Sequence, residues 1–270
     1  MQIVGDLHIH SKYSSGASRN IDIFGLALNS AKKGLKILGT GDCLHPSWLH
    51  KLRIELTEYT DGFYFLEKVP TVHFVLQSEI ELIWKHNGLL KRVHFILLFP
   101  NFEKLDESYI FLSRYGNLSL NGRPKIYCSV ESIIYGLKTI DSSIEIIPAH
   151  IFTPFFGIFG EKLLFKNLKE ALGESMSLIY AIETGLSADP MMVRSISELN
   201  NLTIISNSDC HSTCFHRLGR EANVFDLNKS NYRNLIESIR KSKIVKTYEF
   251  KPSAGKYYYD GHRKERHDNK

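Results

Sequence analysis

Short apolar runs rich in β-formers alternate with amphipathic stretches along most of the chain. The strand-like runs predict strands at 3–7, 36–40, 72–78, 93–99, 144–148, 178–183 and 202–207. The amphipathic stretches predict helices at 22–34, 130–138, 168–173, 190–200 and 230–242. Repeated alternation of this kind favours an α/β fold with a parallel sheet closed into a somewhat irregular barrel.

Composition supports one domain of barrel size. The chain has 270 residues, 43% hydrophobic and 23% charged, which suits one large buried core. After Phe250 the apolar periodicity ends and charge becomes dense, so we expect a catalytic barrel over 1–249 and a basic C-terminal tail over 250–270.

Other features of the sequence indicate where the protein is located and which partners suit it. The longest apolar runs, 94–99 and 155–159, are too short to span a bilayer, and no signal-peptide pattern opens the chain, so we expect a cytoplasmic protein without membrane contact. Four scattered cysteines without a CxxC pair indicate neither a disulfide framework nor a cysteine zinc ribbon. A net charge of +5 is compatible with phosphate-rich partners but favours them only slightly.

Polar residues recur immediately after the predicted strands, where barrel enzymes place their chemistry. The first strand leads into His8 and His10, whose alternate spacing points both imidazoles to one side of an extended backbone. The remaining members of the set are Asp42, His45, Glu79, His94, His150, Glu183, Asp209 and His211. Any one of them has a structural explanation as a helix cap, an ion-pair partner or a core histidine. Their recurrence at matched positions instead predicts a metal centre.

The donor set indicates which metals and which chemistry. It exceeds the four ligands of a structural zinc, and mixed histidine and carboxylate donors suit Zn²⁺, Mn²⁺ or Fe²⁺ better than Ca²⁺. We therefore expect two or three divalent metals, Mg²⁺ included among the possibilities. Paired metals serve in-line displacement at phosphorus, so hydrolysis of a phosphoester is the expected reaction. The chain contains neither GxxxxGK[ST] nor a dinucleotide GxGxxG motif, which excludes P-loop and Rossmann enzymes.

The opening motif DxHxH, at Asp6, His8 and His10, resembles that of the polymerase and histidinol phosphatase (PHP) superfamily. The resemblance implies a distorted (β/α)7 TIM-like barrel with a trinuclear metal site at the C-terminal ends of the strands. It also implies that Glu79 bridges two metals. The full ligand set that it implies is His8, His10, Glu79, His94, His150, Asp209 and His211.

Within that superfamily the chain is most similar to the N-terminal catalytic domain of the endonuclease Q family. The similar stretches are 6–14, 34–49, 122–127, 146–162, 182–192, 205–212, 218–227 and GKYYYDGHR at 255–263. This resemblance implies a metal-dependent endodeoxyribonuclease of DNA repair that cleaves single- or double-stranded DNA 5′ to deoxyuridine, hypoxanthine or an abasic site.

Two departures from the family pattern shape these expectations. In endonuclease Q the GKY segment leads into a cysteine-ligated zinc module, whose cysteines this sequence does not contain, so we expect the DNA-gripping half either to be missing or to be supplied by a separate partner. Many superfamily members have histidine after the aspartate of the second motif, where this chain has Cys43. Asp42 or His45 then has to serve as a ligand, and two metals are a safer expectation than three.

Several residues are candidates for catalysis and DNA contact. Glu79, Asp209 and Arg220 are the expected catalytic residues, with the two carboxylates holding the metals. Arg123 and Arg220 are expected to contact phosphate, although either arginine also suits a salt bridge, Arg220 for example to Glu221. The expected substrate-binding set is Arg123, Phe152, Phe155, Glu183 and Arg220. The aromatic run at 151–157 by itself favours an ordinary core loop, whereas the resemblance favours stacking on an extruded base.

Two other functions use the same residues. A small-molecule phosphomonoesterase of the histidinol phosphatase kind requires the same metals in a closed, basic pocket. A non-catalytic PHP subunit that docks on repair or replication proteins requires no metals at all. Metal content separates the last of these from an enzyme, because an enzyme holds two or more metals per chain.

Overall fold

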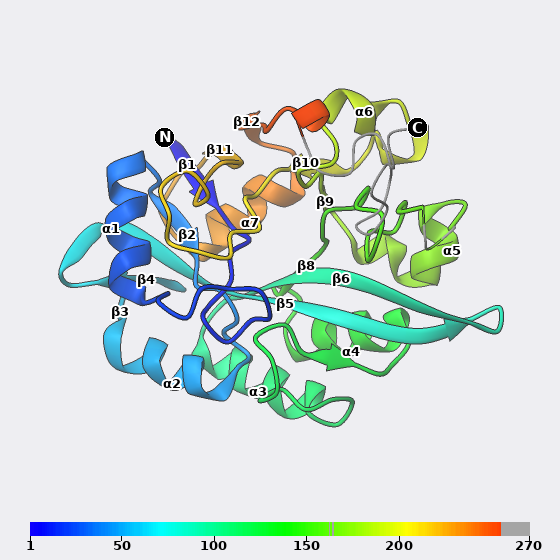
Figure 1. The fold of residues 1–270 in the computed structure, drawn as a ribbon, viewed down its shortest axis with the longest axis horizontal. Coiled ribbons are helices and arrows are strands. Elements are labelled where there is room, and N and C mark those ends of the chain that lie inside the picture. The colour runs from blue at the N-terminus through cyan, green and yellow to red at the C-terminus, as the bar shows by residue number, and fades with distance from the viewer. Residues whose placement is uncertain (162, 164, 255–270) are drawn as a thin grey trace, which may run out of the picture.

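The computed structural model describes residues 1–161, 163 and 165–254, and it shows a mixed α/β fold (Figure 1). Its strands are β1 (Gln2–Asp6), β2 (Ile37–Gly39), β3 (Thr57–Thr60), β4 (Phe63–Leu66), β5 (Val69–His86), β6 (Leu89–Phe99), β7 (Lys125–Ile126), β8 (Glu145–Pro148), β9 (Ala181–Glu183), β10 (Thr203–Ile205), β11 (Ala222–Asp226) and β12 (Ile244–Tyr248). The α-helices are α1 (Ile23–Lys33), α2 (Pro46–Glu55), α3 (Phe102–Leu112), α4 (Val130–Ile140), α5 (Leu168–Leu172), α6 (Pro190–Arg194) and α7 (Tyr232–Arg240). Short 3₁₀ turns are η1 (Gly173–Leu178), η2 (Ser197–Leu199) and η3 (Pro252–Ala254).

The sheet is large, and it mixes parallel and antiparallel strands. Ten strands form one sheet in the order β12-β11-β1-β2-β5-β4-β3, with β6 joining β5 to β8 and β7 beside β5. The pairs β1–β2 and β2–β5 are parallel, whereas β5–β6 and β6–β8 are antiparallel. Strands β9 and β10 form a separate parallel pair. The α/β class is therefore confirmed, but among the described residues the ladders do not close into the expected barrel.

The central difference from the expected fold is a long hairpin. The runs at 72–78 and 93–99 are parts of β5 and β6, which pair antiparallel from Leu76–Phe99 to His86–Leu89. Asn87 and Gly88 form its turn, both with positive φ (49° and 75°), as a two-residue hairpin turn of this type requires. The ribbon reaches past α4 and α5 at one side of the molecule (Figure 1).

The helices follow local capping signals. Asp22 accepts a hydrogen bond from Gly25 N at the start of α1, and Gly34, with φ 86°, ends that helix. Pro46 occupies the first turn of α2, and Asn101 caps α3 by accepting from Lys104 N. The helix expected over 190–200 is instead divided into α6 and η2. The expectation was wrong because the chain leaves the helix after Arg194.

Beneath the helices lies a continuous apolar core, with a smaller apolar cluster on the side of α7. Within the described ranges no helix is both long and apolar enough to cross a bilayer. Residues 250–254 end in η3, and the GKYYYDGHR segment lies outside the described residues. The division into a barrel over 1–249 and a tail over 250–270 stays a proposal.

Candidate metal centre

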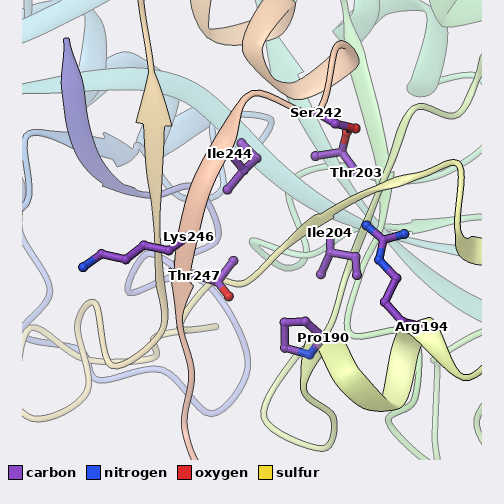
Figure 2. A pocket seen from close by; sticks show the side chains of 8 residues that line it. All are labelled: Pro190, Arg194, Thr203, Ile204, Ser242, Ile244, Lys246 and Thr247. Atoms are coloured by element: carbon purple, nitrogen blue, oxygen red, sulfur yellow. The ribbon is translucent and has the colours of Figure 1, made fainter.

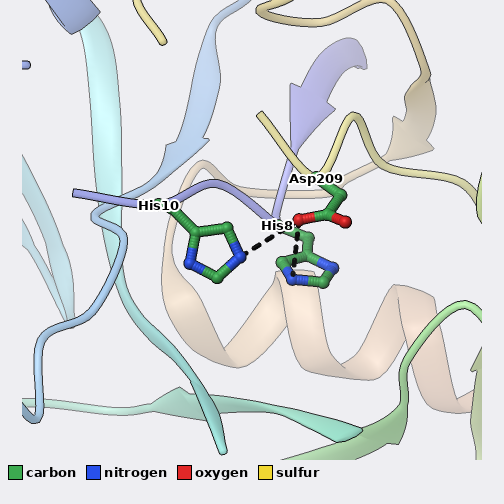
Figure 3. Close-up of side chains that lie close together, drawn as sticks. All are labelled: His8, His10 and Asp209. Carbon is green, nitrogen blue, oxygen red and sulfur yellow. Dashed lines mark ion pairs between the residues drawn. The ribbon is translucent and has the colours of Figure 1, made fainter. Parts of the chain in front are cut away.

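The first cluster of candidate ligands forms where β1 ends. His8 and His10 are alternate residues of extended chain, and an isolated parallel bridge between Ile9 and Cys210 brings Asp209 beside them. Asp209 Oδ1 lies 3.0 Å from His10 Nε2 and 3.8 Å from His8 Nε2 (Figure 3). Asp209 has φ 46°, an unusual backbone conformation for a residue with a side chain.

The second cluster consists of Glu79, His94 and His150. Glu79 Oε1 lies 2.8 Å from His94 Nδ1 and 3.1 Å from His150 Nε2. Glu79 and His94 stand in the middle of the β5–β6 hairpin rather than after strand ends, and His150 follows β8 with φ 33°. Burial lowers the pKa of His94 to about 4, so its imidazole is neutral, as a metal ligand must be.

Glu79 connects the two clusters. Its Oε1 faces His94 and His150, whereas its Oε2 lies 3.2 Å from His10 Nε2 and 3.7 Å from His8 Nε2. The carboxylate is fully buried. One oxygen directed toward each cluster is the arrangement of a carboxylate that bridges two cations, which is the role implied by the family resemblance.

The buried atoms of the first cluster fit a cation. Within the described chain, His8 Nε2, His10 Nε2 and Asp209 Oδ1 are buried and form no hydrogen bond, although both nitrogens lie within 3.8 Å of Asp209 Oδ1. Buried polar atoms are rarely left without a partner, and lone pairs that converge in this way suit a divalent metal. The residues present therefore fit the metals that the donor set predicts.

Further carboxylates hold the two histidines that follow β1 in orientation. Glu183 is buried, and both its oxygens lie 3.0 Å from His8 Nδ1; it also accepts hydrogen bonds from His150 N and Asn207 Nδ2. Asp42 Oδ1 lies 3.0 Å from His10 Nδ1, and Asp42 Oδ2 accepts from Ser11 N and Oγ. Each ring is thereby turned so that Nε2 points to the cluster.

The electrostatics of the site favour positive charge. Burial lowers the pKa of His8, but attraction by Glu183 and Glu79 outweighs it, so the pKa lies well above its usual value. Burial likewise lowers the pKa of His10, and Asp42 and Asp209 raise it overall. A buried site that stabilises protons so strongly also attracts cations.

The structure places Asp42, His45 and His211 outside the two clusters. Both Asp42 oxygens accept hydrogen bonds, as described above. His45 Nε2 lies 3.0 Å from Ser119 O, and its ring stacks on Tyr13 at 4.2 Å. His211 lies beside His10, with ring centroids 4.3 Å apart, and its Nδ1 is 2.9 Å from the carbonyl oxygen of Asp209. Metal binding by these three residues stays a proposal.

Some of the candidate substrate residues lie at the two clusters, and others contact residues that hold the ligands in place. Arg123 Nη1 donates to Glu79 Oε2 at 3.0 Å, so this arginine contacts the clusters directly. Arg220 Nε instead donates to Ser208 O at 3.1 Å and so supports the loop that carries Asp209. Glu183, being fully buried, faces His8 and not solvent.

The aromatic loop 151–159 contacts the site through a residue that the sequence did not single out. Phe152 packs on Phe159, and Phe155 lies beside Phe156. Phe156 stacks on His94 with centroids 4.3 Å apart and planes at 6°. It has φ 78°, and its carbonyl accepts from His94 N. The aromatic run was visible in the sequence, but only the backbone turn identifies which ring covers the ligand.

A pocket of about 190 Å³ lies elsewhere, between α6, β10 and β12 (Figure 2). Thr203 and Ser242 line it together with Arg194 and Lys246. Thr203 begins β10, whereas Asp209 follows the opposite end of that strand. The pocket therefore contains none of the candidate ligands.

Glutamine at position 183 tests the support of His8. We expect Glu183→Gln to fold but to weaken metal binding by about 10- to 100-fold, because a neutral amide attracts the His8 N–H less strongly than a carboxylate does. Titration calorimetry with Mn²⁺ measures this affinity. Glu237→Gln, on the exposed surface of α7 beside Lys241, is the matched control. Unchanged affinity in Glu183→Gln would show that His8 is not oriented by this contact.

Comparisons with known proteins agree with this geometry. No protein-family model matches the chain. The crystal structure of a lesion-specific endonuclease, EndoQ from Pyrococcus furiosus, matches 95% of this chain and 61% of its own length, with 32% identity and a TM-score of 0.84. Endonuclease Q in complex with a 27-mer duplex bearing an abasic lesion matches 96% and 62%, with 33% identity and a TM-score of 0.85.

Nearly the whole length of this chain resembles endonuclease Q. This confirms the resemblance expected from its motifs. The chain spans about three fifths of the endonuclease Q structures that it matches. A two-domain protein from Bacteroides vulgatus with a predicted PHP-like metal-dependent phosphoesterase matches 92% of this chain and 65% of its own, with 13% identity and a TM-score of 0.56. At that identity the likeness extends to the fold alone.

Proposed function

We propose that the chain is a metal-dependent endonuclease of DNA repair that hydrolyses the phosphodiester 5′ to a deaminated base or an abasic site. The observation that carries this proposal is Glu79, a buried carboxylate with one oxygen toward each of two histidine-containing clusters. The likeness to endonuclease Q, whose solved complex contains duplex DNA with an abasic lesion, supports the choice of substrate.

The two clusters support a proposed set of metal ligands. His8, His10 and Asp209 would hold one divalent metal, His94 and His150 would hold the other, and Glu79 would serve both. When bound, such metals activate a water and neutralise charge on the phosphate. The native ions are Zn²⁺, Mn²⁺, Mg²⁺ or Fe²⁺, all of which accept nitrogen and carboxylate donors.

The chain's other residues position the substrate and the ligands. Arg123 lies at the edge of the site with 22% of its side chain exposed, and only one of its nitrogens is bound to Glu79. Its guanidinium is therefore available to a phosphate oxygen. Arg220 acts on the reaction through the Ser208 carbonyl and so positions Asp209. Phe156 covers His94 and excludes water from that ligand.

Recognition of DNA completes the proposal. The net charge of +5 suits a polyanion. The lesion is expected to be deoxyuridine, hypoxanthine or an abasic site.

A nicking assay tests the proposed function. The chain loaded with Mn²⁺ or Zn²⁺ is incubated with labelled single-stranded and duplex oligonucleotides that carry one lesion, beside an undamaged duplex and an aryl phosphate. We expect a metal-dependent nick 5′ to the lesion and none in undamaged DNA. Turnover of the aryl phosphate without nicking would instead identify a phosphomonoesterase. Metal content below one per chain would identify a non-catalytic subunit.

A further inference from the structure

The loop between α3 and β7, residues 113–124, is fastened to the segment that follows His10. Ser119 O accepts a hydrogen bond from His45 Nε2 at 3.0 Å. Asn121 Nδ2 donates to Ser15 Oγ at 2.5 Å, and Gly122 N donates to Tyr13 O at 3.0 Å. Contacts on both sides of position 120 therefore hold this part of the loop in one conformation.

Gly122 brings the same loop against the support of the metal centre. A Cβ at this position would lie 2.3 Å from Asp42 Oδ2 and 2.5 Å from Ser14 Oγ, so only glycine allows the close approach. Asp42 is the carboxylate that orients His10. One residue further, Arg123 contacts Glu79. The loop is thus positioned by the site itself.

Leu120 is an apolar residue of this loop that is exposed, whereas Leu118 in the same loop is buried. The Leu120 side chain is 80% exposed, although its neighbours Ser119 and Asn121 both have hydrogen-bond partners. It lies three residues from Arg123, so the two Cα atoms are at most about 11 Å apart. The loop therefore presents an exposed leucine within reach of the arginine that is proposed to contact phosphate.

We propose that Leu120 is a wedge that enters the base stack of duplex DNA at the lesion while Arg123 contacts the adjacent phosphate; this inference rests on the proposed function. Apolar side chains, leucine among them, insert between base steps and kink the duplex. A base that is damaged or missing lowers the free energy needed to open the stack. A fixed apolar residue near the scissile phosphate therefore couples cleavage to a weakened step and favours lesions over intact DNA.

The test compares duplex with already opened DNA. We expect Leu120→Ala to cut a lesion-bearing duplex at least about ten-fold more slowly, because nothing replaces the displaced stacking. The same variant should cut single-stranded DNA, or a duplex with a bubble at the lesion, at the wild-type rate. Leu120→Met should retain duplex cleavage. Leu89→Ala, at the exposed tip of the β5–β6 hairpin, is the matched control.

A second readout reports the wedge without cleavage. In Ca²⁺, 2-aminopurine placed beside the lesion should become brighter with wild-type protein and with Leu89→Ala, and remain quenched with Leu120→Ala. Equal duplex-to-single-strand ratios in wild type and Leu120→Ala would overturn the wedge and leave the nuclease intact. Wild-type protein that cuts single strands but no duplex would also overturn it. Failure of wild-type protein to cut any lesion-bearing DNA would overturn the proposed function, and the wedge with it.

Discussion

Glu79→Gln is expected to abolish nicking and to prevent metal binding at both clusters. The substitution keeps the size of the side chain but removes the charge that faces His8 and His10 through one oxygen and His94 and His150 through the other. We expect cleavage to fall at least about a thousand-fold, because bound metals contribute several kcal/mol of transition-state stabilisation. Metal analysis of the purified variant should give less than one metal per chain.

A second glutamate on the same face of β5 provides the control for this experiment. Glu81 lies two residues beyond Glu79 and pairs with Arg92 instead of with the histidines. Glu81→Gln should therefore keep its metals and its nicking activity. If Glu79→Gln retained two metals per chain, the bridging assignment would be wrong. If both variants lost metal equally, the loss would come from damage to β5 rather than from the missing ligand.

The hairpin that carries Glu79 shows why the fold was only partly predictable from the sequence. The runs at 72–78 and 93–99 are indeed strands, but the alternation of strands and helices suggested a parallel repeat. Asn87-Gly88 is the local sequence signal for the turn, since this dipeptide between apolar runs indicates a hairpin. With that turn, β5 and β6 are antiparallel, Glu81 pairs in register with His94, and Glu79 lies diagonally across the ribbon from His94.

The candidate ligands were found because chemistry restricts them more tightly than topology does. The spacing of His8 and His10 defines one face of an extended segment whatever sheet it joins. The roles of Asp42 and Glu183 were harder to predict from the sequence, because a carboxylate that binds a metal and one that orients a histidine look the same there. Only the contacts to His10 Nδ1 and His8 Nδ1 separate the two roles.

Backbone conformation was also hidden from the sequence. Asp42, His150 and Asp209 all adopt positive φ, between 33° and 46°. Because none of them is a glycine, the sequence does not predict this conformation. Such conformations cost of order 1–3 kcal/mol each and persist where the surroundings enforce them. Their concentration around the two clusters is independent support for a functional site, because the rest of the fold does not require them.

A buried glutamate beside this site is expected to make the stability of the protein fall as pH rises. Glu221 is fully buried, accepts from Ser206 Oγ at 2.8 Å and from Phe250 N at 3.1 Å, and lies near Glu249, which shares the same serine hydroxyl. Burial raises the pKa of Glu221 from 4.5 to about 8, and the charge of Glu249 adds to this rise. The folded protein therefore keeps a proton that the unfolded chain releases.

The direction of the effect follows from that proton. Below pH 4.5 both states are protonated at Glu221, between 4.5 and about 8 the unfolded state loses its proton first, and above 8 both are ionised. Stability is thus lost through this window and stays low above it. Because one pKa unit corresponds to about 1.4 kcal/mol, the loss amounts to a few kcal/mol.

Glu221→Gln removes the titrating group and should remove this part of the pH dependence. In urea unfolding of the metal-free chain, the variant should gain stability relative to wild type by a few kcal/mol between pH 4.5 and pH 9. Glu67→Gln, on the exposed surface, should follow wild type throughout. A constant difference between Glu221→Gln and wild type across the window would mean that Glu221 is ionised in the folded protein. The Ser206 hydroxyl would then be shared by two carboxylates, and the loop from Ser206 to Asp209 would lie in a more negative field, which favours the metal at His8 and His10.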